Sequence, residues 1–97
     1  MPTYLSLLNW TEQGMKSVKD SPKRLDAIKK TFKDMGGEMK AFYMLQGTYD
    51  LALISELPND ETLAKLMLKV GAAGNVRTTT MRAYPEAEYR KIMGDLG

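Results

Sequence analysis

The chain has 97 residues, enough for one small domain but short enough to leave much of its surface exposed. With 43% apolar and 27% charged residues it has an ordinary globular composition, and a net charge of +2 is too small to indicate nucleic acid or a membrane as partner. Cysteine and histidine are both absent, which excludes disulfides and thiolate chemistry and removes the commonest metal ligand and general base, so we expect neither a metal nor a cofactor.

The N-terminal residues lack the basic region and the long apolar run of a signal peptide. No apolar stretch approaches the length needed to span a membrane. A chain without cysteine can function in a reducing compartment, so a cytoplasmic location is the default expectation.

The first third of the chain predicts a strand followed by a helix. Residues 4–10 form a short apolar run of strand length, and the polar segment 11–19 is either a loose helical turn or a loop. Ser21 is then expected to cap a helix that has Pro22 at its first position. The helix shows a core-facing apolar stripe and a terminating glycine pair: Leu25, Ile28, Phe32, Met35, Gly36 and Gly37.

A hairpin is predicted around Gly47. Apolar runs at 41–45 and 51–57 flank it, and glycine readily adopts the positive φ of a tight turn. In this interpretation Tyr49 and Asp50 start the return strand, with a phenol and a carboxylate side by side.

A second helix should follow, capped by Asn59 or Asp60 and broken by Gly71 and Gly74. Its apolar stripe consists of Leu63, Leu66, Met67 and Val70.

The end of the chain predicts one more strand, over residues 75–84, and a short final helix. Pro85 opens that helix, and Tyr89, Ile92 and Met93 are expected on its inner side.

The resulting order is strand, helix, strand, strand, helix, strand and a short C-terminal helix. This is the βαββαβ order of α+β, ferredoxin-like folds, in which both crossover helices lie on one face of a four-stranded antiparallel sheet. We expect one domain over residues 1–97.

The other face of this sheet also looks apolar. If the turn lies at Gly47-Thr48, Phe42 faces Leu53 and Met44 faces Leu51 on one side. The opposite side then carries Tyr43, Leu45, Asp50, Ala52 and Ile54. Helices cover only one side, so we predict that two chains bury the other, sheet against sheet, as a dimeric α+β barrel.

Several sequence blocks in this order resemble the GYD domain family. They are Trp10-Thr11-Glu12-Gln13-Gly14, Lys19-Asp20-Ser21-Pro22 with Arg24, Lys40-Ala41-Phe42-Tyr43, Gly47-Thr48-Tyr49-Asp50 and Gly74-Asn75-Val76-Arg77-Thr78-Thr79-Thr80. The resemblance spans nearly the whole chain. It implies a small stand-alone bacterial or archaeal protein of the dimeric α+β barrel class. The resemblance indicates the fold more clearly than it indicates an activity.

Chain order brings three polar segments to one edge of the predicted sheet. The first strand ends, the hairpin turns and the fourth strand begins at this edge, and the segment after the first strand arches over it. The candidate ligand pocket therefore consists of Trp10, Thr11, Gln13, Lys16, Tyr49, Asp50, Asn75 and Arg77.

Each candidate has a structural alternative. Asp50 is a possible general base or ligand acceptor, but a carboxylate near a turn more often binds backbone amides or pairs with a cation such as Arg77 or Lys16. Tyr49 and Trp10 offer ligand surfaces, or else they fill the core or a dimer interface. Arg77 with the threonines at 78–80 offers an anion site, although threonine also simply favours strands.

Three functional hypotheses follow. The favoured one is a small-molecule-binding module with a pocket between sheet and helices. The alternative is a cofactor-independent enzyme like the monooxygenases and isomerases found on dimeric α+β barrels, in which Asp50, Tyr49 or a lysine would move the proton. The second alternative is a structural homo-oligomer without a ligand. In each case the expected partner is a second copy of the chain.

Overall fold

The computed structural model describes all residues, 1–97, and contains the expected elements in the expected order. No helix in it is both long enough and apolar enough to cross a lipid bilayer. The elements are β1 (Thr3–Trp10), α1 (Glu12–Lys16), the short 3₁₀ helix η1 (Val18–Asp20), α2 (Ser21–Asp34), β2 (Glu38–Met44), β3 (Leu51–Glu56), α3 (Asp60–Ala72), β4 (Val76–Ala83) and α4 (Glu86–Gly94).

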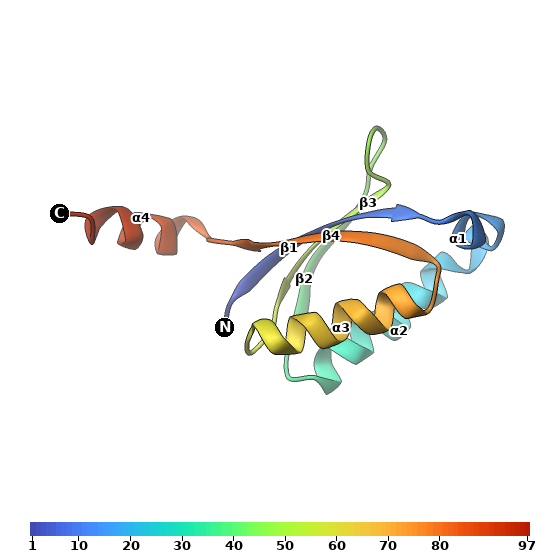
Figure 1. The fold of residues 1–97 in the computed structure, drawn as a ribbon, viewed down its shortest axis with the longest axis horizontal. Coiled ribbons are helices and arrows are strands. Elements are labelled where there is room, and N and C mark those ends of the chain that lie inside the picture. The colour runs from blue at the N-terminus through green and yellow to red at the C-terminus, as the bar shows by residue number, and fades with distance from the viewer.

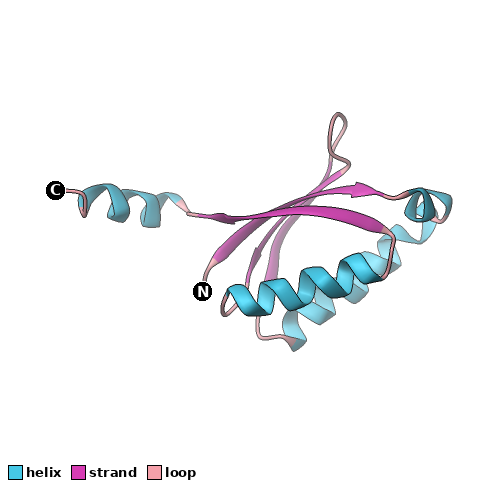
Figure 2. Cartoon of the chain, viewed as in Figure 1, coloured by secondary structure: helices cyan, strands magenta, loops and turns pink.

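The strands form one antiparallel sheet in the order β2-β3-β1-β4, and α2 and α3 cover one of its faces (Figures 1 and 2). This is the predicted α+β, ferredoxin-like arrangement, with β1 between β3 and β4. The predicted register is also confirmed, because Phe42 lies opposite Leu53 and Met44 lies opposite Leu51.

The hairpin differs from the prediction in its length. β2 ends at Met44 and β3 begins at Leu51, so Tyr49 and Asp50 belong to the loop and do not start the return strand. The Asp50 backbone still bonds to both neighbouring segments, because its N–H donates to Leu8 O of β1 (2.9 Å) and its carbonyl oxygen accepts from the N–H of Leu45, just after β2 (2.7 Å). Gly47 has the expected positive φ of 134°, and the loop stands clear of the sheet on the side opposite the helices (Figure 1).

The helix ends also refine the prediction. Asn59 caps α3 as expected, with its Oδ1 accepting from the Thr62 N–H (2.9 Å), but Gly71 lies within that helix and does not break it. Ser21 is not the cap of α2, because η1 runs directly into α2 and Ser21 is already helical. Pro22 still lies in the first turn, where its missing N–H costs nothing.

The core is densely packed at only one end of the sheet. The side chains with almost no exposure cluster where β1 begins, and they are Tyr4, Ser6, Phe32, Ser55, Leu57 and Leu66. Toward the end of β1, Trp10, Ile28 and Val76 are only partly buried. Only 12 of the 97 residues are fully buried, so the single chain covers its apolar surface incompletely.

The face of the sheet away from the helices is uncovered and largely apolar. Tyr43, Ile54 and Met81 are 59%, 37% and 41% exposed, and they lie on the same side as the half-buried Leu5 and Leu7 of β1. We call this surface the open face.

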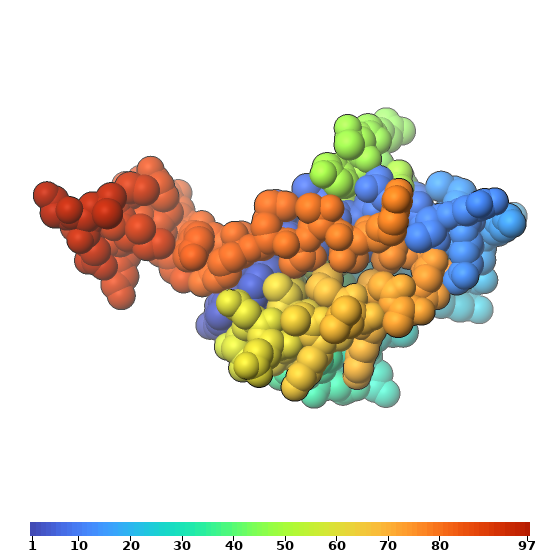
Figure 3. Space-filling view, in the orientation of Figure 1, coloured from blue at the N-terminus to red at the C-terminus, as the bar shows by residue number.

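α4 contradicts the expectation that its apolar residues face inward. β4 carries it beyond the sheet, and the helix stands apart from the body (Figure 3). Tyr89, Ile92 and Met93 are therefore 52%, 42% and 49% exposed. Its side-chain link to the body is the ion pair between Glu88 and Arg82 (3.4 Å).

Replacing Tyr4 with phenylalanine tests the tie between β1 and α3. The change removes the hydrogen bond that the buried Tyr4 hydroxyl donates to Oδ1 of Asp60 (2.5 Å). Because Asp60 is itself exposed, we expect the free energy of unfolding at neutral pH to fall by about 1 to 2 kcal/mol, toward the low end for bonds to charged groups. Urea unfolding measures the loss, and Tyr89→Phe on α4 is the matched control that should unfold like the parent.

The pH dependence of the same pair gives an internal check. Burial, reinforced by the Asp60 carboxylate, raises the pKa of Tyr4 from 10.0 to about 12. The folded state thus favours the neutral phenol. The stabilisation from Tyr4 is complete below the pKa of the unfolded chain, 10.0, and is lost as the pH rises through the pKa of the folded protein, about 12. The stability difference between parent and Tyr4→Phe should shrink over that interval, and a constant difference would contradict this role for Tyr4.

Candidate functional site

The end of β1 is held by the side chain of Asp50. The Trp10 N–H donates to Oδ2 of Asp50 (3.0 Å), while the Asp50 N–H donates to Leu8 O (2.9 Å). The carboxylate thus satisfies a backbone donor at the point where β3 no longer pairs with β1. Of the roles considered for Asp50, binding a backbone amide is the one that the geometry supplies.

Thr11 ties the start of α1 to the start of β4. Its N–H donates to Asn75 O (3.0 Å), and its hydroxyl donates to Gly74 O (2.5 Å) while accepting from the Gly14 N–H (3.1 Å). Thr11 is therefore both the N-cap of α1 and a clamp between two segments far apart in sequence.

Gln13 completes this connection. Its Nε2 donates to Ala73 O and to Oδ1 of Asn75, each at 3.1 Å. Gly14 permits the close approach, since a Cβ at this position would overlap the Asn75 carbonyl oxygen. We call the set Trp10, Thr11, Gln13, Asp50 and Asn75, which the fold brings together, the β1 junction.

Three of the sequence-derived candidates lie outside the junction. Lys16 forms an ion pair with Glu12 within α1 (3.7 Å) and is 78% exposed, and Tyr49 lies in the hairpin loop without a hydrogen bond from its hydroxyl. Arg77 forms no ion pair with Asp50 or with any other carboxylate. It lies opposite Asn9 on the open face, where Asn9 Nδ2 donates to Thr48 O (2.8 Å).

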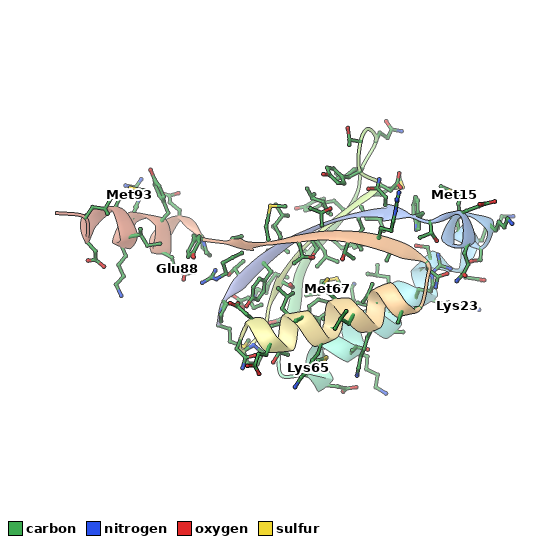
Figure 4. All side chains as sticks on the ribbon, in the orientation of Figure 1. Met15, Lys23, Lys65, Met67, Glu88 and Met93 are labelled. Carbon is green, nitrogen blue, oxygen red and sulfur yellow. The ribbon has the colours of Figure 1, made fainter.

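The three threonines after Arg77 do not form one anion site with it. Strand alternation places Thr79 on the open face with Arg77 and turns Thr78 and Thr80 toward the helices. Thr80 Oγ1 lies 2.8 Å from Ser6 Oγ and 3.2 Å from the sulfur of Met67, which points from α3 toward the sheet (Figure 4).

A cavity lies between the sheet and the two helices, beside the junction. It has a volume of about 330 Å³ and opens between α2 and α3. Trp10 and Asn75 form part of its wall, so the β1 junction closes one end of it. Most of the lining is apolar, and the helices contribute small side chains such as Ala27 and Ala73. We call this cavity the interhelical cleft.

The charged residues of the cleft were not among the sequence candidates. They are Arg24 of α2 and Lys69 of α3, and no carboxylate lines the cavity. Arg24 Nη1 donates to Ser17 O (3.0 Å) and Nη2 donates to Gly14 O (3.3 Å), which fixes the guanidinium between α1 and α2. Arg24 lies one turn before Ile28 and Lys69 lies one turn after Leu66, and this helical spacing from apolar residues was the only available signal. Many solvated lysines share such spacing.

The chain matches a known protein family over most of its length. The model of the GYD domain matches residues 4–93. The chain belongs to the GYD domain family. A Thermus thermophilus protein named glutamine synthetase and cystathionine beta-lyase binding protein is 30% identical to it over 89 residues, 91% of this chain and 94% of the relative.

Solved structures share the fold of this GYD domain at low sequence identity. A feast or famine regulatory protein of M. tuberculosis, solved with L-methionine, superposes with a TM-score of 0.66 at 18% identity, over 88% of this chain and 51% of its own. The protein TTHA0845 of Thermus thermophilus gives 0.55 at 21% identity, over 88% of this chain and 95% of its own. At these identities the likeness concerns the fold.

Gly14→Ala tests the packing of the β1 junction of this GYD domain. The new methyl group must push α1 away from Asn75, and we expect the free energy of unfolding to fall by about 1 to 3 kcal/mol, as in other overpacked sites. Gly71→Ala is the matched control, because a Cβ there meets nothing and the helix gains up to about 1 kcal/mol. Urea unfolding of both variants measures the difference, and a Gly14→Ala protein as stable as the parent would contradict the close approach.

Proposed function

We propose that this GYD domain binds a small organic molecule in the interhelical cleft. The observation that carries the proposal is the cavity of about 330 Å³, which falls at the lower end of the range typical of ligand sites. Its lining is mainly apolar with a few polar groups, the usual composition of such sites. In this arrangement shape and apolar contact supply affinity, while the few polar groups set the orientation of the bound molecule.

The catalytic alternative has less support from the placement of its residues. Asp50 and Tyr49 were the expected proton-transfer groups, and neither lines the cleft. The Asp50 carboxylate is already engaged with the Trp10 backbone. Lys69 is the lysine that reaches the cavity, so an enzyme of this architecture would have to depend on it. Binding requires no such group, and we therefore favour it.

We further propose that two copies pair through their open faces. Exposed Tyr43, Ile54 and Met81 form an apolar surface of the kind that soluble proteins usually cover. A second sheet packed on it would bury both layers, and it would leave the interhelical cleft on the outer side of each chain. The structural homo-oligomer considered from the sequence is thus compatible with a ligand site and does not replace it.

A second candidate function is docking to a different protein. The exposed apolar residues Ile92 and Met93 of α4, and Leu96 just after it, favour this function, because a nine-residue helix that packs against nothing is marginal in water. The Thermus relative is named for binding two enzymes. In this function α4 would be the contact element.

Ligand binding can be tested with 1-octanol as a neutral apolar probe. Trp10 is the only tryptophan and lines the cleft, so its emission should shift as the probe displaces water, and the melting temperature should rise. Ala27→Phe should fill the cavity and weaken binding at least tenfold. Ala64→Phe, on the exposed side of α3 and outside the lining, is the control that should bind like the parent. Equal binding by Ala27→Phe, or no binding by the parent, would contradict the proposed site.

The proposed dimer can be tested by placing a charge on the open face. Ile54→Lys should convert the dimer to a monomer in light scattering coupled to size-exclusion chromatography, because a lysine cannot be buried between two apolar sheets without a partner. Leu68→Lys, at a 74% exposed position on α3, should leave the mass unchanged. A monomeric parent would refute the pairing.

A truncated chain that ends at Tyr84 tests the role of α4. It should stay dimeric if α4 binds another protein, and it should dissociate if α4 binds the second copy.

A further inference from the structure

The two cations of the interhelical cleft lie at the same end of it. α2 follows the end of β1 after the short helices α1 and η1, and it leads to β2, which runs parallel to β1. α3 ends just before β4, whose first residue Val76 lies opposite Trp10. The two helices are therefore antiparallel, with the first turns of α2 and the last turns of α3 at the Trp10 end. Arg24 is in the first part of α2 and Lys69 is in the last turn of α3, so both flank this end.

The two cations at this end have no ion-pair partner within the protein. The guanidinium of Arg24 binds the neutral carbonyls of Ser17 and Gly14, and neither Arg24 nor Lys69 forms an ion pair. The lining contains no aspartate or glutamate. Arg77 and most surface lysines also lack an ion pair, and Arg24 and Lys69 differ from them in lining a cavity.

The rest of the cavity wall is apolar except for Ser21, Thr31 and Asn75. The sheet contributes residues such as Leu53 and Phe42, and the helices contribute Ile28 and Leu66, without a charged group among them. A molecule in the cleft thus meets hydrocarbon along most of its length and two cations near Trp10. A ligand complementary to this wall is apolar at one end and anionic at the other.

We propose that the ligand of the cleft is an apolar monocarboxylic acid, bound with its carboxylate between Arg24 and Lys69. This inference rests on the proposed ligand-binding function and adds the chemical class of the ligand. A free α-amino acid matches the cleft less well, because no carboxylate lines it to receive the ammonium group. A neutral molecule matches the apolar wall but leaves both cations unpaired.

Three probes of equal chain length separate these possibilities. Octanoate should bind more tightly than 1-octanol, by roughly fivefold, which is the upper end expected for a solvent-accessible ion pair. 2-Aminooctanoate, which adds an ammonium group, should bind more weakly than octanoate. Trp10 emission follows all three titrations, and added salt should weaken octanoate binding while leaving 1-octanol binding unchanged.

Lys69→Gln tests the cation directly. It should remove most of the preference for octanoate over 1-octanol and leave the affinity for 1-octanol as in the parent. Lys65→Gln is the matched control on the same helix, since Lys65 does not line the cleft and points away from the sheet (Figure 4). Lys69 is a cleaner test than Arg24, because Arg24 also holds α1 against α2.

The outcomes distinguish this inference from the function on which it rests. If 1-octanol binds as tightly as octanoate, or if Lys69→Gln keeps the full preference for octanoate, the carboxylate assignment is wrong while small-molecule binding stands. If 2-aminooctanoate binds most tightly, the ligand class is amino acids and the assignment is again wrong. If none of the probes shifts Trp10 emission, both the assignment and the proposed function fail.

Discussion

The way in which α2 and α3 pack on the sheet is the constraint on which the rest of the molecule depends. At the start of β1 the two helices pack on the sheet around large, fully buried side chains, including Phe32 of α2 and Tyr4 of β1. At the other end they present Ala27 and Ala73, which are too short to fill the gap. The dense end supplies the stability that lets the other end stay open, because an unfilled apolar cavity forfeits dispersion contacts along its walls.

Backbone hydrogen bonding explains why the polar residues near the cavity are not free for chemistry. A chain that leaves β1 and turns into α1 exposes donors and acceptors that no strand or helix satisfies, and they must find partners. Asp50, Thr11 and Gln13 serve as those partners at the β1 junction. What remains available to a ligand is the indole of Trp10, the apolar wall and the two cations.

The sequence was sufficient to predict the features that depend on periodicity. Alternation and the spacing around Gly47 predicted the register of Phe42 with Leu53, and side-chain chemistry narrowed the cap of α3 to Asn59 or Asp60, of which Asn59 is the cap. The hairpin loop is longer than predicted, and the Asp50 N–H at its end donates to Leu8 O of β1, a contact between segments distant in sequence. Such a contact cannot be inferred from the local pattern.

Arg24 and Lys69, for the same reason, become candidates only when the separation of α2 and α3 is known. The apolar stripe of α4 was interpreted correctly as amphipathic, but an apolar stripe indicates that a surface needs covering without indicating which surface covers it.

The cleft and the open face share the same strands while facing opposite ways. Leu8 and Leu53 line the cleft, and their neighbours Leu7 and Ile54 lie on the open face, since strand alternation turns successive side chains to opposite sides. A ligand and a second copy of the chain would therefore touch no common side chain, and any coupling between them must pass through the twist or order of the shared backbone. Without such a change in the sheet, ligand binding and pairing would contribute independently to stability, because neither alters the free energy of the other.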